Sequence, residues 1–185
     1  MRTCEWCGVS IVSRNAQARF CTPKHRVRAH RAKTGIPHEL TSRDRWVRWD
    51  LENRKGRQEK VPKQISGENA SSTNPNTWAS HVEAAKSSVG VGLGYVLGDG
   101  IGCIDLDHCL VDGNPTPATT AYLSDYPNHY IEISPSGDGL HIWGYRDEKP
   151  GRKQTINGLS VEIYSTGRYI TVTGTVYQHG QLKAL

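Results

Sequence analysis

The chain has 185 residues, of which 36 % are hydrophobic and 22 % are charged, a composition suited to one ordinary globular domain with a small appended module. No stretch approaches the roughly 20 uninterrupted apolar residues of a membrane span, and the N-terminus lacks the apolar core of a secretory signal, so we expect neither membrane insertion nor secretion. The net charge is +5, but residues 1–33 carry eight Lys and Arg against Glu5 alone, giving +7 and leaving −2 for the rest. This basic head points to a polyanionic partner such as nucleic acid.

The basic head contains four potential metal ligands in two close pairs. Two residues separate Cys4 from Cys7, three separate Cys21 from His25, and thirteen lie between the pairs. This spacing is typical of tetrahedral Zn²⁺ sites, and zinc would supply the folding free energy of a segment too short to bury a core. Two alternatives remain open: His30 in place of His25, or reduced cysteines in a disordered basic tail.

Three parts follow from this organisation: a zinc-binding module at 1–34, a linker at 35–45 and a larger domain at 46–185. Gly35 and Pro37 interrupt the pattern in the linker, as turn-forming residues do. Within the larger domain the polar stretch 52–64 is predicted to form a loop or a hairpin.

Two helices and six strands are predicted in the larger domain. Asn74 and Pro75 predict a helix start, after which Trp78, Val82 and Ala85 would form one buried face. A second helix is predicted from a Thr-Pro pair at 116–117. The β-like runs are 92–97, 101–106, 130–134, 140–143, 160–164 and 169–173. Runs of strands with few helices predict an α+β fold with a mixed or antiparallel sheet.

Two aspartates alternate with apolar residues on the run 101–106 and just beyond it. Strand alternation puts Asp105 and Asp107 on one face, roughly 6.6 Å apart along the strand, with Ile104 and Leu106 on the other. Paired carboxylates on a partly buried sheet repel each other unless a cation compensates, and their oxygens suit Mg²⁺ or Mn²⁺. The alternative is an ordinary solvated strand end.

A serine- and glycine-rich turn joins the next two predicted strands. Small residues let backbone N–H groups approach an anion, and the hydroxyls of Ser134 and Ser136 add donors. The turn is therefore a candidate phosphate cradle with His141 beside it. Asp138 lies in the same turn, where its charge would repel a phosphate unless it faces away or helps to bind metal. A plain turn followed by a structural histidine is the alternative.

A third carboxylate, Glu162, lies between Val161 and Ile163, so strand alternation turns it to the face opposite those apolar neighbours. It could equally be an ordinary exposed glutamate on a half-buried strand.

Together, the Asp-x-Asp pair, the Ser-x-Ser-Gly-x-Gly-x-His segment and the apolar-flanked glutamate follow in that order within about sixty residues. Here the sequence resembles the archaeo-eukaryotic primase superfamily, most closely the primase-polymerase domains of phages and plasmids. The resemblance runs from about Trp46 to the C-terminus and includes the segment 168–174. The head resembles the zinc fingers attached to many primases, although its last ligand is His25 where related phage fingers often have a fourth cysteine.

The resemblance implies a primase-polymerase that transfers nucleotides by a two-metal mechanism in phage or plasmid DNA replication. Its metal ligands for Mg²⁺ or Mn²⁺ would be Asp105, Asp107 and Glu162, with His141 as a further catalytic group. The residues that hold the nucleotide triphosphate would be Ser134, Ser136, Gly137, His141, Arg168 and Lys60. The implied partners are a single-stranded DNA template and nucleoside triphosphates, in the cytoplasm of a bacterial host if a phage or plasmid encodes the chain.

Two departures qualify this resemblance. The sequence holds no phosphate-binding loop of the G-x-x-x-x-G-K-[ST] type, so a replicative helicase would be a separate partner. The chain also ends soon after Gly174, where family members commonly continue with more helices, so either a compact protein or a piece of a longer one fits. Two other functions stay open: a catalytically inactive primase-like module that binds single-stranded or origin DNA, and a metal-dependent nuclease.

Overall fold

The computed structural model describes residues 2–4, 9–11, 18–24 and 35–185, in two compact units, Met1–His38 and Glu39–Leu185. In the first unit the backbone N–H of Cys4 donates to the carbonyl of Val9 at 2.8 Å, and that of Ile11 donates to the carbonyl of Arg2 at 3.0 Å. These bonds pair two short segments antiparallel. No helix in the described residues is long and apolar enough to cross a membrane.

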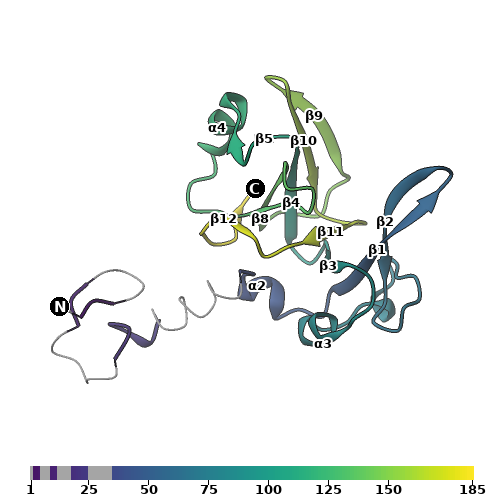
Figure 1. The fold of residues 1–185 in the computed structure, drawn as a ribbon, viewed down its shortest axis with the longest axis horizontal. Helices are drawn as coiled ribbons and strands as arrows, with labels where there is room; N and C mark the ends of the chain where they lie inside the picture. The colour runs from purple at the N-terminus through teal and green to yellow at the C-terminus, as the bar shows by residue number, and fades with distance from the viewer. Residues whose placement is uncertain (1, 5–8, 12–17, 25–34) are drawn as a thin grey trace. The chain divides into compact units, whose positions relative to one another are not determined.

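The smaller of the two main sheets in the second unit has four antiparallel strands in the order β11-β3-β1-β2. They are β1 (Trp46–Arg54), β2 (Arg57–Lys63), β3 (Gly92–Val96) and β11 (Tyr169–Val172). The polar stretch 52–64 is a hairpin of β1 and β2, which turns at Lys55 and Gly56, both with positive φ. Figure 1 shows this hairpin projecting beyond the other strands of the unit.

The larger sheet has the strand order β12-β7-β8-β4-β10-β9, and β13 pairs parallel with β8. Its strands are β4 (Ile101–Asp107), β7 (Tyr130–Ile133), β8 (Leu140–Tyr145), β9 (Arg152–Ile156), β10 (Leu159–Tyr164), β12 (Val176–Gln178) and β13 (Lys183–Ala184). A separate small ribbon pairs β5 (Leu110–Val111) with β6 (Asn114–Pro115). The six predicted strand runs are confirmed, and the unit is α+β with mostly antiparallel sheets.

The helices are short, and one predicted helix is wrong. Asn74 caps only the 3₁₀ turn η1 (Pro75–Thr77), and a new helix, α3 (His81–Lys86), begins after Ser80 in a capping box with Glu83. Val82 is 57 % exposed, so the predicted apolar face does not form. The second predicted helix is confirmed as α4 (Pro117–Leu123), capped by Thr116. A short helix, α2 (His38–Thr41), lies within the predicted linker.

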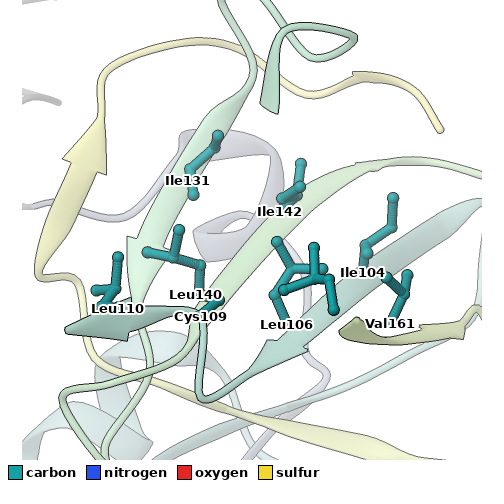
Figure 2. Packing of buried hydrophobic residues seen from close by; sticks show 9 residues of the cluster. Ile104, Leu106, Cys109, Leu110, Ile131, Leu140, Ile142 and Val161 are labelled. Carbon is teal, nitrogen blue, oxygen red and sulfur yellow. The ribbon is translucent and has the colours of Figure 1, made fainter. Parts of the chain in front are cut away.

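The main core lies on one face of the larger sheet. Two apolar rows cross β7, β8, β4 and β10, one of isoleucines and one of mixed aliphatic residues, as the strand register requires. Figure 2 shows these side chains packed together, apart from Ile133 and Ile163, which it does not label, and residues of α4 pack against the cluster. The rows comprise Ile131, Ile142, Ile104 and Ile163, then Ile133, Leu140, Leu106 and Val161. Because strands alternate, the other face of these four strands carries the intervening residues.

Candidate active site

A continuous row of polar side chains crosses the face of the larger sheet opposite the core. Glu132 on β7 pairs with His141 on β8, His141 with Asp105 on β4, Asp105 with Glu162 on β10, and Glu162 with Lys153 on β9. Residues directly opposite in a sheet share a face and approach closely. We call these five residues the polar row. Three separate stretches of sequence thus meet at one place.

Asp105 and Asp107 lie on this face as strand alternation predicts. Asp107 is exposed at the end of β4, opposite Ser160, whereas the Asp105 side chain is only 22 % exposed. Burial raises the pKa of Asp105, and the neighbouring charges of Asp107 and Glu162 add to that effect against those of His141 and Lys60. Burial thus disfavours the charged form of Asp105, a condition that a bound cation would relieve.

Glu162 is buried and already has two polar partners. Lys153 donates to its Oε1, and the Tyr164 hydroxyl donates to its Oε2 at 2.5 Å. Burial works to raise the pKa of Glu162, but these two hydrogen bonds and the charges of Lys153 and Arg168 together outweigh it, and the pKa lies below its ordinary value. Glu162 is thus an ionised carboxylate that would have to exchange Lys153 for a cation in order to ligate one.

The serine turn between β7 and β8 lies against the end of β4 that carries Asp107. Ser134 and Ser136 hydroxyls are 2.9 Å apart, and Gly137 has φ +84°, a conformation that favours glycine. A Cβ added to Gly139 would stand 2.7 Å from the Ser134 Oγ and 2.8 Å from the Leu106 carbonyl oxygen. Glycine at 139 therefore permits the turn to approach the strand end.

Asp138, whose role the sequence left open, has one side-chain partner inside this turn and a second that follows β4. His108 Nδ1 and Asp138 Oδ2 are 2.5 Å apart, and the Ser136 hydroxyl donates to Asp138 Oδ1 at 2.5 Å. The bonds from Ser136 and His108 lower the pKa of Asp138, and the bond to Asp138 raises the pKa of His108. Ser136 and His108 thus favour the charged form of Asp138.

The two cations predicted to contact the triphosphate are Lys60 and Arg168. The charge of each affects the pKa of one acidic residue of the polar row. Lys60, on β2, lies 5.7 Å from the centroid of the Trp49 ring, and its charge acts to lower the pKa of Asp105. Arg168 precedes β11, stacks 4.2 Å from the centroid of the Tyr164 ring and acts to lower the pKa of Glu162. Both side chains therefore belong to the surroundings of the polar row although they come from outside the larger sheet.

The structure describes only half of the predicted zinc ligands. Cys4 is buried and Cys21 is half-buried, while Cys7 and His25 lie outside the described residues. Across the parts of the chain that are described, no three His, Cys, Asp or Glu side chains converge closely enough to hold a metal ion. The zinc site therefore stays a prediction, and so does a divalent-metal site that combines Asp105, Asp107 and Glu162.

Two members of the polar row, Glu132 and Lys153, were not predicted. Glu132 shares the alternating apolar pattern of its strand, which is a weak signal, and Lys153 follows no motif. Both are identified by cross-strand register, because only the pairing of β7 with β8 and of β9 with β10 brings them beside His141 and Glu162.

The geometry defines an α+β unit with an acidic site built across an antiparallel sheet and flanked by cationic side chains. Carboxylates beside cations can hold a divalent ion and a polyphosphate together.

No family model matches the chain. It is similar to a protein of Nitratiruptor phage NrS-1, a DNA primase-polymerase: the two are 37 % identical over 142 residues, which is 71 % of this chain and 19 % of the relative. The chain spans less than a fifth of that relative's length.

Proposed function

We propose that the unit Glu39–Leu185 is a primase-polymerase catalytic domain, which transfers nucleotides from nucleoside triphosphates to a growing strand on a DNA template. The observation that carries the proposal is the polar row, in which an Asp-x-Asp strand, a histidine strand and a glutamate strand pair side by side. The similarity to a phage primase-polymerase, which covers 71 % of the chain, supports the same function.

Asp105 and Asp107 fit as ligands for Mg²⁺ or Mn²⁺ because their carboxylates share a face of β4 and because burial disfavours the charged form of Asp105. Glu162 would join them after its ion pair with Lys153 opens. Two such cations, when bound, would activate the attacking 3′-hydroxyl and neutralise the leaving pyrophosphate. Lys153, once released, would remain beside the phosphates as a cation.

The triphosphate of the incoming nucleotide would be held by donors around the row. His141 would contact it from β8, the turn 134–137 would offer hydroxyls and backbone N–H groups, and Lys60 and Arg168 would supply positive charge. The basic head, with zinc on Cys4, Cys7, Cys21 and His25, would engage the single-stranded template. A separate helicase would open the duplex.

The test is a synthesis assay with the full chain, single-stranded DNA, labelled nucleotides and either Mg²⁺ or Mn²⁺, with and without a primer. We expect labelled product and released pyrophosphate, and product in the primer-free reaction would identify a primase. Cleavage of a labelled strand without pyrophosphate would favour the nuclease. DNA binding with neither product nor cleavage would favour the inactive binding module.

A second prediction concerns the two flanking cations. Lys60→Ala and Arg168→Ala are each expected to raise KM for the nucleotide roughly tenfold, since a hydrogen bond to a charged group contributes about 1.5–3 kcal/mol. The effect on kcat should be smaller if these side chains bind the triphosphate equally in the ground and transition states. Lys86→Ala, at an exposed position on α3, is the matched control and should leave KM unchanged. Unchanged KM in both variants would remove Lys60 and Arg168 from the nucleotide site.

A further inference from the structure

Glu132 is a fully buried carboxylate that no sequence motif identifies. A buried charge is costly unless hydrogen bonds satisfy it, and Glu132 is 0 % exposed. Hydrogen-bonding groups from β7, from β8 and from the residues that follow β11 surround its carboxylate. They are the Tyr130 hydroxyl, the Trp143 indole, His141 Nδ1, the Thr173 hydroxyl and the backbone N–H groups of Thr173 and Gly174.

The two oxygens of Glu132 serve different parts of the fold. Oε1 accepts from the Trp143 indole N–H at 3.1 Å and lies 3.2 Å from His141 Nδ1. Oε2 accepts from the Tyr130 hydroxyl at 3.2 Å and from the Gly174 N–H at 2.9 Å. The Oε2 bonds therefore immobilise the carboxylate, and the Oε1 contacts face the site.

His141 is held between two carboxylates on neighbouring strands. Its side chain is only 3 % exposed, its Nδ1 faces Glu132, and its Nε2 lies 3.6 Å from Asp105 Oδ1. An ionised carboxylate can only accept a hydrogen bond, so the contact with Glu132 requires a proton on Nδ1. The imidazole and the Trp143 ring are perpendicular to each other, with centroids 6.4 Å apart. The ring thus has one orientation, with Nε2 toward Asp105.

We propose that Glu132 is a positioning residue that acts through His141. It fixes the imidazole by accepting from Nδ1, and it thereby directs Nε2 to the Asp105 side of the sheet, where a phosphate oxygen of the incoming nucleotide would lie. This role rests on the proposed nucleotidyl transfer, because it concerns the same site. The hydrogen-bond partners of Glu132 include neither Asp105 nor Asp107, so it would act on the nucleotide only through His141.

A double-mutant cycle in the full chain tests whether Glu132 acts through His141. Glu132→Gln keeps the side-chain size but replaces one carboxylate oxygen with an NH₂ group. That NH₂ must face either the Trp143 and His141 groups or the Tyr130 and Gly174 groups, so acceptance of hydrogen bonds is lost on that side. We expect kcat/KM to fall roughly tenfold to a hundredfold, the range seen when a residue that orients a functional histidine is lost. His141→Ala should cost at least as much, and the double variant should be no worse than His141→Ala alone. Additive losses would overturn the proposal.

Tyr130→Phe is the matched control for a purely structural role. It removes one of several donors to Oε2, where the backbone N–H groups of Thr173 and Gly174 still hold the carboxylate, and it does not change the contacts of Oε1. If Glu132 positions His141, Tyr130→Phe should retain near wild-type kcat/KM. If Glu132 merely anchors the fold, Tyr130→Phe and Glu132→Gln should lower thermal stability and activity together, which would contradict the proposal.

A measurement on the wild-type chain without metal or nucleotide covers the case in which Glu132→Gln does not fold. Nitrogen-15 chemical shifts of the His141 ring should show a protonated Nδ1. An Nδ1 without a proton would overturn the contact with Glu132. Because this readout does not depend on synthesis, a wild-type chain that makes no product but shows a protonated Nδ1 would refute the proposed function while leaving the contact intact.

Discussion

Replacing Asp105 or Asp107 with asparagine is expected to lower template-directed synthesis by at least about a hundredfold, the usual cost of removing one group that stabilises transition-state charge. Asparagine keeps the size of the side chain but removes the charge that would bind a divalent cation. The two aspartates share one face of β4, and Asp105 lies between His141 and Glu162 in the polar row. Initial rates with Mg²⁺ and with Mn²⁺, at saturating nucleotide, would measure the loss.

The same substitution should not harm the fold. Folding raises the pKa of Asp105 through burial and through the charges of Asp107 and Glu162, so the folded state binds a proton at this site more tightly than the unfolded state. Wild-type stability therefore falls as the pH rises through the interval between the unfolded and the folded pKa. An asparagine side chain cannot ionise, so Asp105→Asn should remove this fall and be at least as stable above that interval.

Asp112→Asn is the matched control, because Asp112 is an exposed residue in the turn between β5 and β6 and has positive φ, which asparagine tolerates. It should leave both activity and stability unchanged. Full synthesis by Asp105→Asn or Asp107→Asn, in a chain that melts as the wild type does, would refute the proposed metal site.

The sequence predicted the strands and their faces because strand alternation is a local property. Asp105, Asp107 and Glu162 each follow an apolar neighbour on their strands, and a period of two is enough to turn them away from the core. The confirmed start of α4 has the same kind of local origin, since Thr116 and Pro117 suit the first positions of a helix.

What the sequence could not predict depends on pairing between distant segments. The contacts of Glu132 with His141 and of Lys153 with Glu162 follow from the register of β7 with β8 and of β9 with β10, which no single strand specifies. The failed helix has a different cause. Ser80 and Glu83 form a capping box that begins α3 anew, and Trp78, whose indole donates to the Ser71 carbonyl, is left outside both short helices.

Loss of the predicted zinc ion is expected to unfold the basic head and to impair initiation more than extension. Structural zinc contributes about 10–16 kcal/mol in peptides of this kind, far more than a segment of this length gains from burial. Cys4, which is buried at the end of the paired segments 2–4 and 9–11, is the predicted ligand to replace. Cys4→Ser should lose the one zinc ion expected per chain and start new strands roughly tenfold more slowly or worse.

Elongation separates this prediction from a general loss of activity. The polar row belongs to the unit Glu39–Leu185, which has its own core, so Cys4→Ser should extend an annealed primer at nearly the wild-type rate. Cys109→Ala changes a buried cysteine in that core and serves as the matched control. This variant should keep the zinc predicted for the head. Zinc content by elemental analysis and the two rates would be measured on the same samples. Retained zinc in Cys4→Ser would exclude Cys4 as a ligand, whereas equal losses of initiation and extension would mean that the head supports the whole reaction rather than its first step.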